Sequence, residues 1–205
     1  MKSNICKIEN GTKDLAAILK ESEKVAVYNE LTHKQTLQLR LLCEEIDGML
    51  PNIIDDFSGD LWIEFEDGVC KVNISLYFEE FTPEKKGELV GIAKNKKNAA
   101  VSGIVGKIRS ALEDVFFEDG CFAGPDLSLE SRYFVTQYYD SMDHYSGMDY
   151  ACLWSLEQYR STVRKEEHTE EWDELEKSVI ASVADDVIVG VKGKHADIII
   201  VKKFA

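Results

Sequence analysis

Residues 61–78 predict a tight β-hairpin, and this hairpin constrains the fold more than any other part of the chain. Apolar residues alternate with polar or amphipathic ones on both sides of Asp67-Gly68, a dipeptide that favours a type I′ turn. A two-residue loop pairs Phe65 with Cys70, so the apolar residues of both strands share one face. One apolar and one more polar face predict an antiparallel sheet covered by helices on one side.

A helix precedes the hairpin, and its start is marked by a capping box. Thr32 is followed three residues later by Gln35, the spacing at which the two side chains cap each other's backbone N–H groups. Pro51 is expected to disturb the end of this helix, which places its regular part at residues 33–50. Its predicted core face consists of Leu39, Leu42, Ile46, Met49 and Ile53.

Weaker patterns predict further elements on both sides of this segment. They are a helix capped by Thr12 and continuing to Tyr28, a helix over residues 99–117, a strand over residues 131–140, a helix from Trp154 to Arg164, a helix from Thr169 through Val183, and a second hairpin over residues 187–201 that turns near Gly193-Lys194. The order of elements predicts an α+β protein: a two-layer α/β sandwich with a mainly antiparallel sheet, helices on one face, and a C-terminal helix-and-hairpin extension. The corresponding domain division is a first domain over residues 1–120 and an α/β extension over residues 121–205, with the alternative that both pack as one compact unit.

Composition narrows the class of protein. A chain of 205 residues buries roughly 70% of its unfolded surface, so it needs neither disulfides nor a metal for stability. The formal net charge of -14 argues against nucleic-acid binding, which depends on lysine and arginine, and against attraction to anionic membranes. Five scattered cysteines without a CxxC pair, together with the lack of a signal-like or membrane-spanning apolar run, predict a cytoplasmic protein.

The stretches LRLLCEEIDGML and GDLWIEFEDGVCKVNISLYFE resemble the ATP-binding domain of the GHKL superfamily, in particular bacterial histidine-kinase ATPase domains and anti-sigma-factor kinases. The resemblance covers about residues 12–117. It implies that Glu45 matches the family's catalytic glutamate. The family's Mg²⁺-binding asparagine, four residues later, is replaced by Met49, and a thioether is a poor donor for a hard cation.

The resemblance also implies positions for nucleotide binding. Glu79 or Glu80 stands where the family has an adenine-reading aspartate, although no glycine motif follows Phe78. The glycine-rich phosphate motif has a partial counterpart before and within the helix predicted over residues 99–117, where backbone N–H groups can hold phosphate. The residues expected to contact the nucleotide are Glu79, Lys94, Lys97, Asn98, Gly103, Gly106 and Lys107.

These features together lead to one main functional hypothesis. The chain is expected to be a regulatory or protein-interaction module on a degenerate histidine-kinase-like ATPase fold, without efficient ATP hydrolysis and with a protein partner. The alternative is an ATP-binding kinase or ATPase with unusual metal and nucleotide ligands, in which ATP is the cofactor. A homodimer formed through residues 133–150 or a hairpin edge is a third possibility.

The sequence gives little support for a metal site or for a nucleophilic triad. Asp140, Asp143 and His144 lack a fourth strong metal ligand, so no metal site is predicted. The local sequence contains no Ser-His-Asp arrangement, and His195, beside a turn, is expected to be solvent-exposed. Trp62 lies on the polar side of the hairpin, where it is expected either to pack under the C-terminal segment or to belong to a partner surface.

Overall fold

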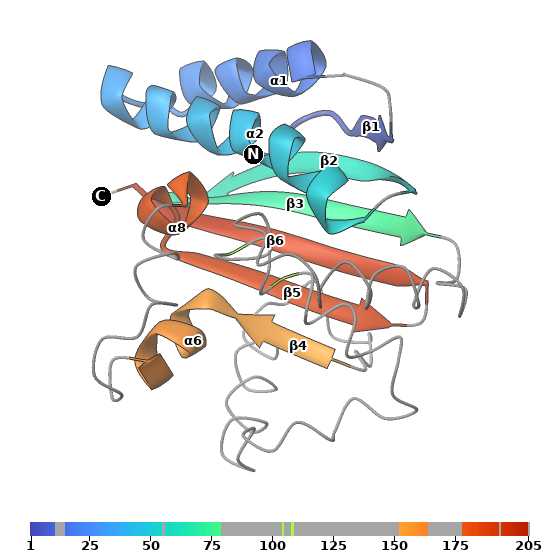
Figure 1. Cartoon of the computed structure of the whole chain (residues 1–205). Helices are drawn as coiled ribbons and strands as arrows, with labels where there is room; N and C mark the ends of the chain where they lie inside the picture. Colours follow the sequence, from blue (N-terminus) through green and yellow to red (C-terminus); the bar gives the residue numbers. More distant parts are fainter. Residues whose placement is uncertain are drawn as a thin grey trace.

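The protein is described by a computed structural model that places residues 1–10, 15–54, 56–78, 104, 108, 152–163, 178–192 and 194–204. These residues form one six-stranded antiparallel sheet with helices against it (Figure 1). The strands, in the order in which they lie side by side, are β1 (Cys6–Glu9), β2 (Phe57–Glu66), β3 (Val69–Phe78), β6 (His195–Lys203), β5 (Asp186–Lys192) and β4 (Cys152–Ser155). The helices are α1 (Leu15–Tyr28), α2 (His33–Ile53), α6 (Leu156–Val163) and α8 (Val179–Val183). The predicted α+β class is confirmed.

The predicted hairpin is present as β2 and β3, with the predicted register. Phe65 pairs with Cys70, and the pairing continues along both strands as far as Phe57 and Phe78. The loop residues Asp67 and Gly68 have φ angles of 49° and 78°, the positive values that a type I′ turn requires. The local pattern alone therefore determined both the turn and the face that each side chain occupies.

Helix α2 begins where the capping box predicts. The Thr32 hydroxyl accepts a hydrogen bond from the Gln35 backbone N–H, and the Gln35 side chain accepts one from the Thr32 N–H at 2.8 Å. The helix passes through Pro51 and ends at Ile53, three residues beyond the predicted regular part. Its last turn is closed by a backbone hydrogen bond from Ile54 to Leu50, so the ring of Pro51 is accommodated near the helix end.

The hydrophobic core lies between α1, α2 and α8 and one face of the sheet (Figure 1). Alternate residues of each long strand point to this face, and the buried stripe of α2 packs onto them. The predicted core residues of α2 that the structure describes are all buried: Leu39, Leu42, Ile46 and Met49. Tyr28, at the end of α1, is instead 72% exposed.

The C-terminal hairpin belongs to the same sheet as the first hairpin. Strand β6 pairs with β3 from Val69–Lys203 to Tyr77–His195, and β5 continues the sheet on its other side. A two-residue connection joins Lys192 to His195, as the predicted turn at Gly193-Lys194 requires. The domain division at residue 120 stays a prediction, because that position lies outside the described residues.

The helix predicted from Trp154 is wrong at its start. Residues 152–155 form strand β4, in which Trp154 pairs with Val189, and α6 begins only at Leu156. The cause is the carboxylate of Asp186, which accepts hydrogen bonds from the Ser155 hydroxyl at 3.1 Å and the Glu157 backbone N–H at 2.9 Å. A cap supplied from a distant strand leaves no local signal in the sequence.

The helix predicted from Thr169 through Val183 is wrong at Ser178, which is not helical. Ser178 has an extended backbone, and its hydroxyl accepts a hydrogen bond from the Ala181 N–H, so Ser178 caps helix α8, which starts at Val179. The part of this prediction before residue 178, the cap Thr12 and the strand at 131–140 lie outside the described residues. Of the helix predicted over residues 99–117, Ile104 and Ile108 are described; both are helical and buried.

Strands β5 and β6 bury side chains on both faces of the sheet. Val189 and Ile198 face the helices, whereas Ile188, Ile199 and Val201 point to the second face and are at most 2% exposed. Continuous apolar runs are typical of strands that are covered on both sides. Among the described helices, none is both long enough and apolar enough to cross a membrane.

Candidate functional site

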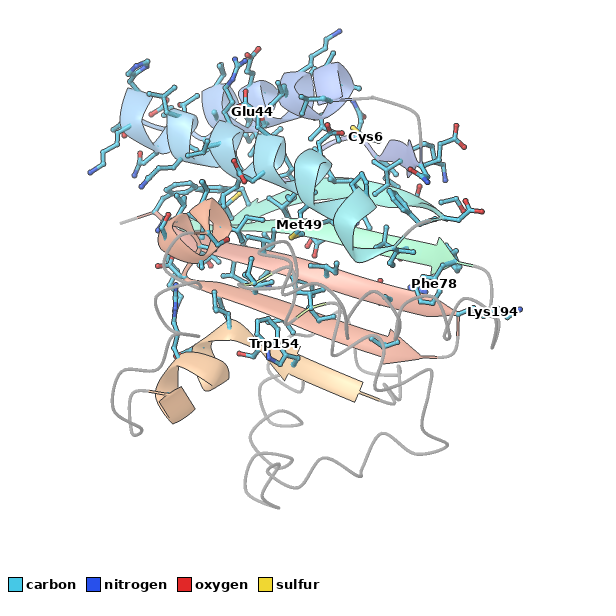
Figure 2. The ribbon with its side chains drawn as sticks, viewed as in Figure 1. Cys6, Glu44, Met49, Phe78, Trp154 and Lys194 are labelled. Carbon is cyan, nitrogen blue, oxygen red and sulfur yellow. The ribbon has the colours of Figure 1, made fainter. Side chains whose placement is uncertain are left out.

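Of the residues expected to perform chemistry, the structure describes Glu45. It lies on the flank of α2 and is half-buried, and its carboxylate forms no hydrogen bond or ion pair with any residue that the structure describes. Met49, one turn later, is 3% exposed and belongs to the hydrophobic core; Figure 2 shows it between α2 and the sheet. The neighbouring Glu44 points away from the sheet and pairs with Arg40, with 3.0 Å between Oε1 and Nε.

The expected nucleotide-binding residues lie outside the described residues. They are Glu79, Lys94, Lys97, Asn98, Gly103, Gly106 and Lys107, so their role stays a prediction. The same holds for Asp140, Asp143 and His144.

The sheet assembles a polar cluster that the sequence did not predict, on the face opposite α1 and α2. Ser75 and Tyr77 of β3 lie beside His195 and Asp197 of β6. The Nε2 atom of His195 lies 3.0 Å from the Ser75 Oγ and 3.0 Å from the Asp197 Oδ1, and its ring meets Tyr77 edge-on with 4.6 Å between centroids. The expected exposure of His195 is wrong: its side chain is 21% exposed, and that of Asp197 is 7% exposed.

This cluster contains serine, histidine and aspartate but does not have the geometry of a nucleophilic triad. In such a triad the carboxylate binds one ring nitrogen, and the serine hydroxyl gives its proton to the other. Here both oxygens approach the same Nε2 atom of His195. An Nε2–H that donates to the Asp197 carboxylate has no lone pair with which to accept the proton of Ser75. The cluster therefore links β3 to β6 and orients Tyr77.

A groove lies beside this cluster, at the end of the sheet where β1 and β3 finish and β2 begins. It consists of two adjoining open hollows of about 280 and 370 Å³ that share Glu9, Ser58 and Tyr77. The remaining residues that line it are Lys7, Ile8, Asn10, Asp56, Phe57, Gly59, Asp60 and Phe78. Tyr77 is 55% exposed within the groove, whereas most of its neighbours in β3 are buried.

The electrostatics of the groove are dominated by carboxylates. Glu9, Asp56 and Asp60 contribute three, and Lys7 is the one basic residue among its lining residues. The Lys7 Nζ lies 2.6 Å from the Asp60 Oδ1, so one carboxylate is neutralised locally. Among the residues that line the groove, acidic side chains outnumber basic ones by three to one.

A second polar site surrounds the start of β5, and its contacts are structural. Asp186, which is 4% exposed, accepts hydrogen bonds from the Ser155 hydroxyl and from the backbone N–H groups of Glu157 and Val187. Arg160 donates to the backbone oxygens of Ala181 and Asp185. These bonds join β4, α6, α8 and β5, so the carboxylate of Asp186 is fully used in holding the elements together.

Trp62 of β2 lies on the same face of the sheet as Tyr77, and it contacts the N-terminal segment. Its indole Nε1 donates to Glu64 at 2.9 Å, and the Lys2 Nζ lies 4.6 Å from the ring centroid, a distance typical of a cation–π contact. The Lys2 Nζ also pairs with Glu64 at 3.1 Å. The segment that covers Trp62 is therefore the beginning of the described chain.

Three cysteines from different elements lie in the core as free thiols: Cys6 of β1, Cys43 of α2 and Cys70 of β3. Burial raises the pKa of Cys70 to about 12 and raises the pKa of Cys43 further, with a contribution from the neighbouring thiols. A thiol is nucleophilic only as a thiolate. Cys43 and Cys70 are therefore inert hydrophobic core residues.

This burial predicts a loss of stability at alkaline pH. An unfolded thiol ionises near pH 8.5, whereas Cys43 and Cys70 stay protonated in the folded state. The stability that these buried thiols contribute is therefore complete below about pH 8.5. It falls as the pH rises above that value. Each thiol costs about 1.4 kcal/mol of unfolding free energy per pH unit above its unfolded pKa. Urea unfolding at pH 7 and pH 10 measures the change, and Cys43→Ala is expected to show a smaller loss between the two. An equal loss in both proteins contradicts this assignment.

Comparison of the chain with known proteins does not assign it to a family. No family model matches the chain, and no curated protein or solved structure matches it. Within the part of the chain that the structure describes, no three histidine, cysteine or acidic side chains come together as metal ligands. The groove, the polar cluster and the environment of α2 are the features of the described chain that bear on its function.

Proposed function

We propose that this chain is a regulatory or protein-interaction module on a degenerate histidine-kinase-like ATPase fold, acting in the bacterial cytoplasm without efficient ATP hydrolysis. The main support is the position of Met49. In the GHKL superfamily, which the sequence resembles, this position holds Mg²⁺ through an asparagine. Here it carries a thioether that is 3% exposed and packed in the hydrophobic core. Neither its chemistry nor its burial suits a hard cation that requires oxygen ligands.

The surroundings of Glu45 give further support. A catalytic carboxylate is normally oriented by hydrogen bonds so that it can position a water. Glu45 has no such bond to any residue in the described part of the chain. Helix α2 and the β2–β3 hairpin are complete and well packed, although the metal-binding asparagine of the superfamily is missing. This combination favours a role in binding a protein partner over a role in ATP hydrolysis.

Thermal unfolding with a nucleotide tests this proposal. We expect no change in Tm when the full chain is heated with 1 mM of a non-hydrolysable ATP analogue and excess Mg²⁺. A site with a dissociation constant of 10 µM would add about 2.7 kcal/mol, which raises the Tm of a chain of this size by roughly 5–10 °C. The matched control replaces Mg²⁺ with EDTA.

A Tm rise that depends on Mg²⁺, accompanied by phosphate release from ATP, would contradict the proposal and support the alternative of a kinase or ATPase. In that case Glu45→Gln tests whether Glu45 is needed for turnover or only for the fold of the helix. A folded Glu45→Gln protein without turnover would identify Glu45 as the catalytic base. We expect instead that Glu45→Gln and the parent protein behave alike in both measurements.

A further inference from the structure

The face of the sheet opposite α1 and α2 is covered in one region and open in another. Ile188, Ile199 and Val201 of β5 and β6 are at most 2% exposed on this face. At the end of β3, on the same face, Tyr77 is 55% exposed and lines the groove. An aromatic ring this exposed, above a hollow in a sheet, is a common anchor in protein–protein contacts.

The ring of Tyr77 is held in place by its neighbours in β6, His195 and Asp197. The ring of His195 meets it edge-on at 4.6 Å, and the His195 Nε2 lies 3.0 Å from the carboxylate of Asp197, whose side chain is 7% exposed. A ring whose neighbour is fixed by a buried carboxylate loses less conformational freedom when a ligand binds. The polar cluster of Ser75, His195 and Asp197 therefore presents a preorganised aromatic surface.

The charges beside Tyr77 select the kind of ligand. Three carboxylates, Glu9, Asp56 and Asp60, line the groove with one ammonium group, that of Lys7, which pairs with Asp60. An anion would meet repulsion here, whereas a guanidinium or ammonium group gains both from carboxylates and from the face of an aromatic ring. The formal net charge of the whole chain, -14, attracts the same class of ligand from a distance.

We propose that the groove of Glu9, Asp56 and Tyr77 binds a basic segment of a protein partner, with an arginine or lysine side chain seated on the ring of Tyr77. The larger hollow, of about 370 Å³, contains Glu9, Asp56 and Tyr77 together and can hold one long basic side chain. The adjoining hollow of about 280 Å³ provides room for the next residues of the segment, along β1 and β2. This inference rests on the proposed function as an interaction module, and it specifies the surface and the chemistry of the partner.

Fluorescence anisotropy with a defined probe tests the inference on the full chain. The probe is a fluorescein-labelled peptide that alternates arginine with glycine and carries three arginines; the reference peptide carries citrulline, which is neutral, at the same positions. We expect the arginine peptide to bind with a dissociation constant at least tenfold lower than that of the citrulline peptide. The affinity is expected to fall as salt rises from 50 to 300 mM, because the contacts are between exposed charges.

Variants then locate the binding site. Tyr77→Ala and Asp56→Asn are each expected to weaken binding of the arginine peptide at least fivefold, whereas Tyr77→Phe, which keeps the ring, stays within twofold. The matched control is Glu30→Gln, which removes the same charge from an exposed turn between α1 and α2 and is expected to change binding less than twofold. Tm values of all variants establish that they remain folded.

Three results would overturn the inference: equal affinity for both peptides, no binding of the arginine peptide at 1 mM protein, or equal weakening by Asp56→Asn and Glu30→Gln. The last would mean that the overall charge, rather than the groove, attracts the peptide. These outcomes are independent of the nucleotide measurement. A Tm rise with Mg²⁺ and the ATP analogue contradicts the proposed function without changing the peptide result.

Discussion

Gly59→Ala is expected to destabilise the protein by roughly 3 kcal/mol, the upper part of the range for overpacked sites. Gly59 lies in β2, opposite Leu76 of β3, and a Cβ atom built on it would stand 2.2 Å from the backbone oxygen of Ser75. A backbone atom cannot move aside as the end of a flexible side chain can. The added methyl group must therefore push β2 and β3 apart where the sheet is continuous on both sides.

The matched control makes the same chemical change in α2. A Cβ atom built on Gly48 meets nothing within 4 Å, and alanine favours a helix over glycine by about 1 kcal/mol. Gly48→Ala is therefore expected to leave stability unchanged or to raise it by up to that amount. Urea unfolding of both variants at pH 7 gives the comparison. If Gly59→Ala unfolds at the same urea concentration as the parent protein, the close approach of Gly59 to Ser75 is wrong.

Met49→Asn is expected to be the most informative change for function. It introduces the residue type that the GHKL superfamily uses for Mg²⁺, but it puts an amide where the side chain is 3% exposed among apolar residues. The loss of apolar volume and the burial of an unpaired amide together cost about 3–5 kcal/mol. We expect a large fall in stability and no gain of Mg²⁺-dependent nucleotide binding.

Met49→Leu is the control, because this swap conserves volume and usually costs less than about 1.5 kcal/mol. Urea unfolding and the nucleotide thermal shift are measured on both variants. A Met49→Asn protein that keeps the stability of Met49→Leu and binds the ATP analogue with Mg²⁺ would mean that position 49 faces a usable site.

The sequence predicted those parts of the fold whose signals are local. Asp67-Gly68 determines the turn and the register of the first hairpin, and Thr32 with Gln35 determines the start of α2. In both cases, residues close together in the chain make the deciding contacts. The same reasoning placed Trp154 in a helix, because the carboxylate that ends β4 and starts α6 comes from Asp186, in a distant strand.

The sequence did not predict the candidate site, because its residues come from strands that are far apart in the chain. His195 and Asp197 are two positions apart on one strand, so their shared face is a pattern that alternation could have revealed. Their contact with Ser75 and Tyr77 depends on the pairing of β6 with β3, which no residue near either strand specifies. The groove needs residues from β1, β2 and β3 together, and only the assembled sheet brings Glu9 close to Tyr77.

The central place of β6 has a consequence for how the chain reaches its native state during synthesis. Ser75 contacts His195 across 120 positions of sequence, so β3 has no partner on that side until the ribosome has released the residues of β6. Pairing between such distant segments is slow, and an open strand edge rich in apolar residues invites association with other chains. A ribosome that stalls between the two hairpins therefore leaves this edge of β3 without its partner strand.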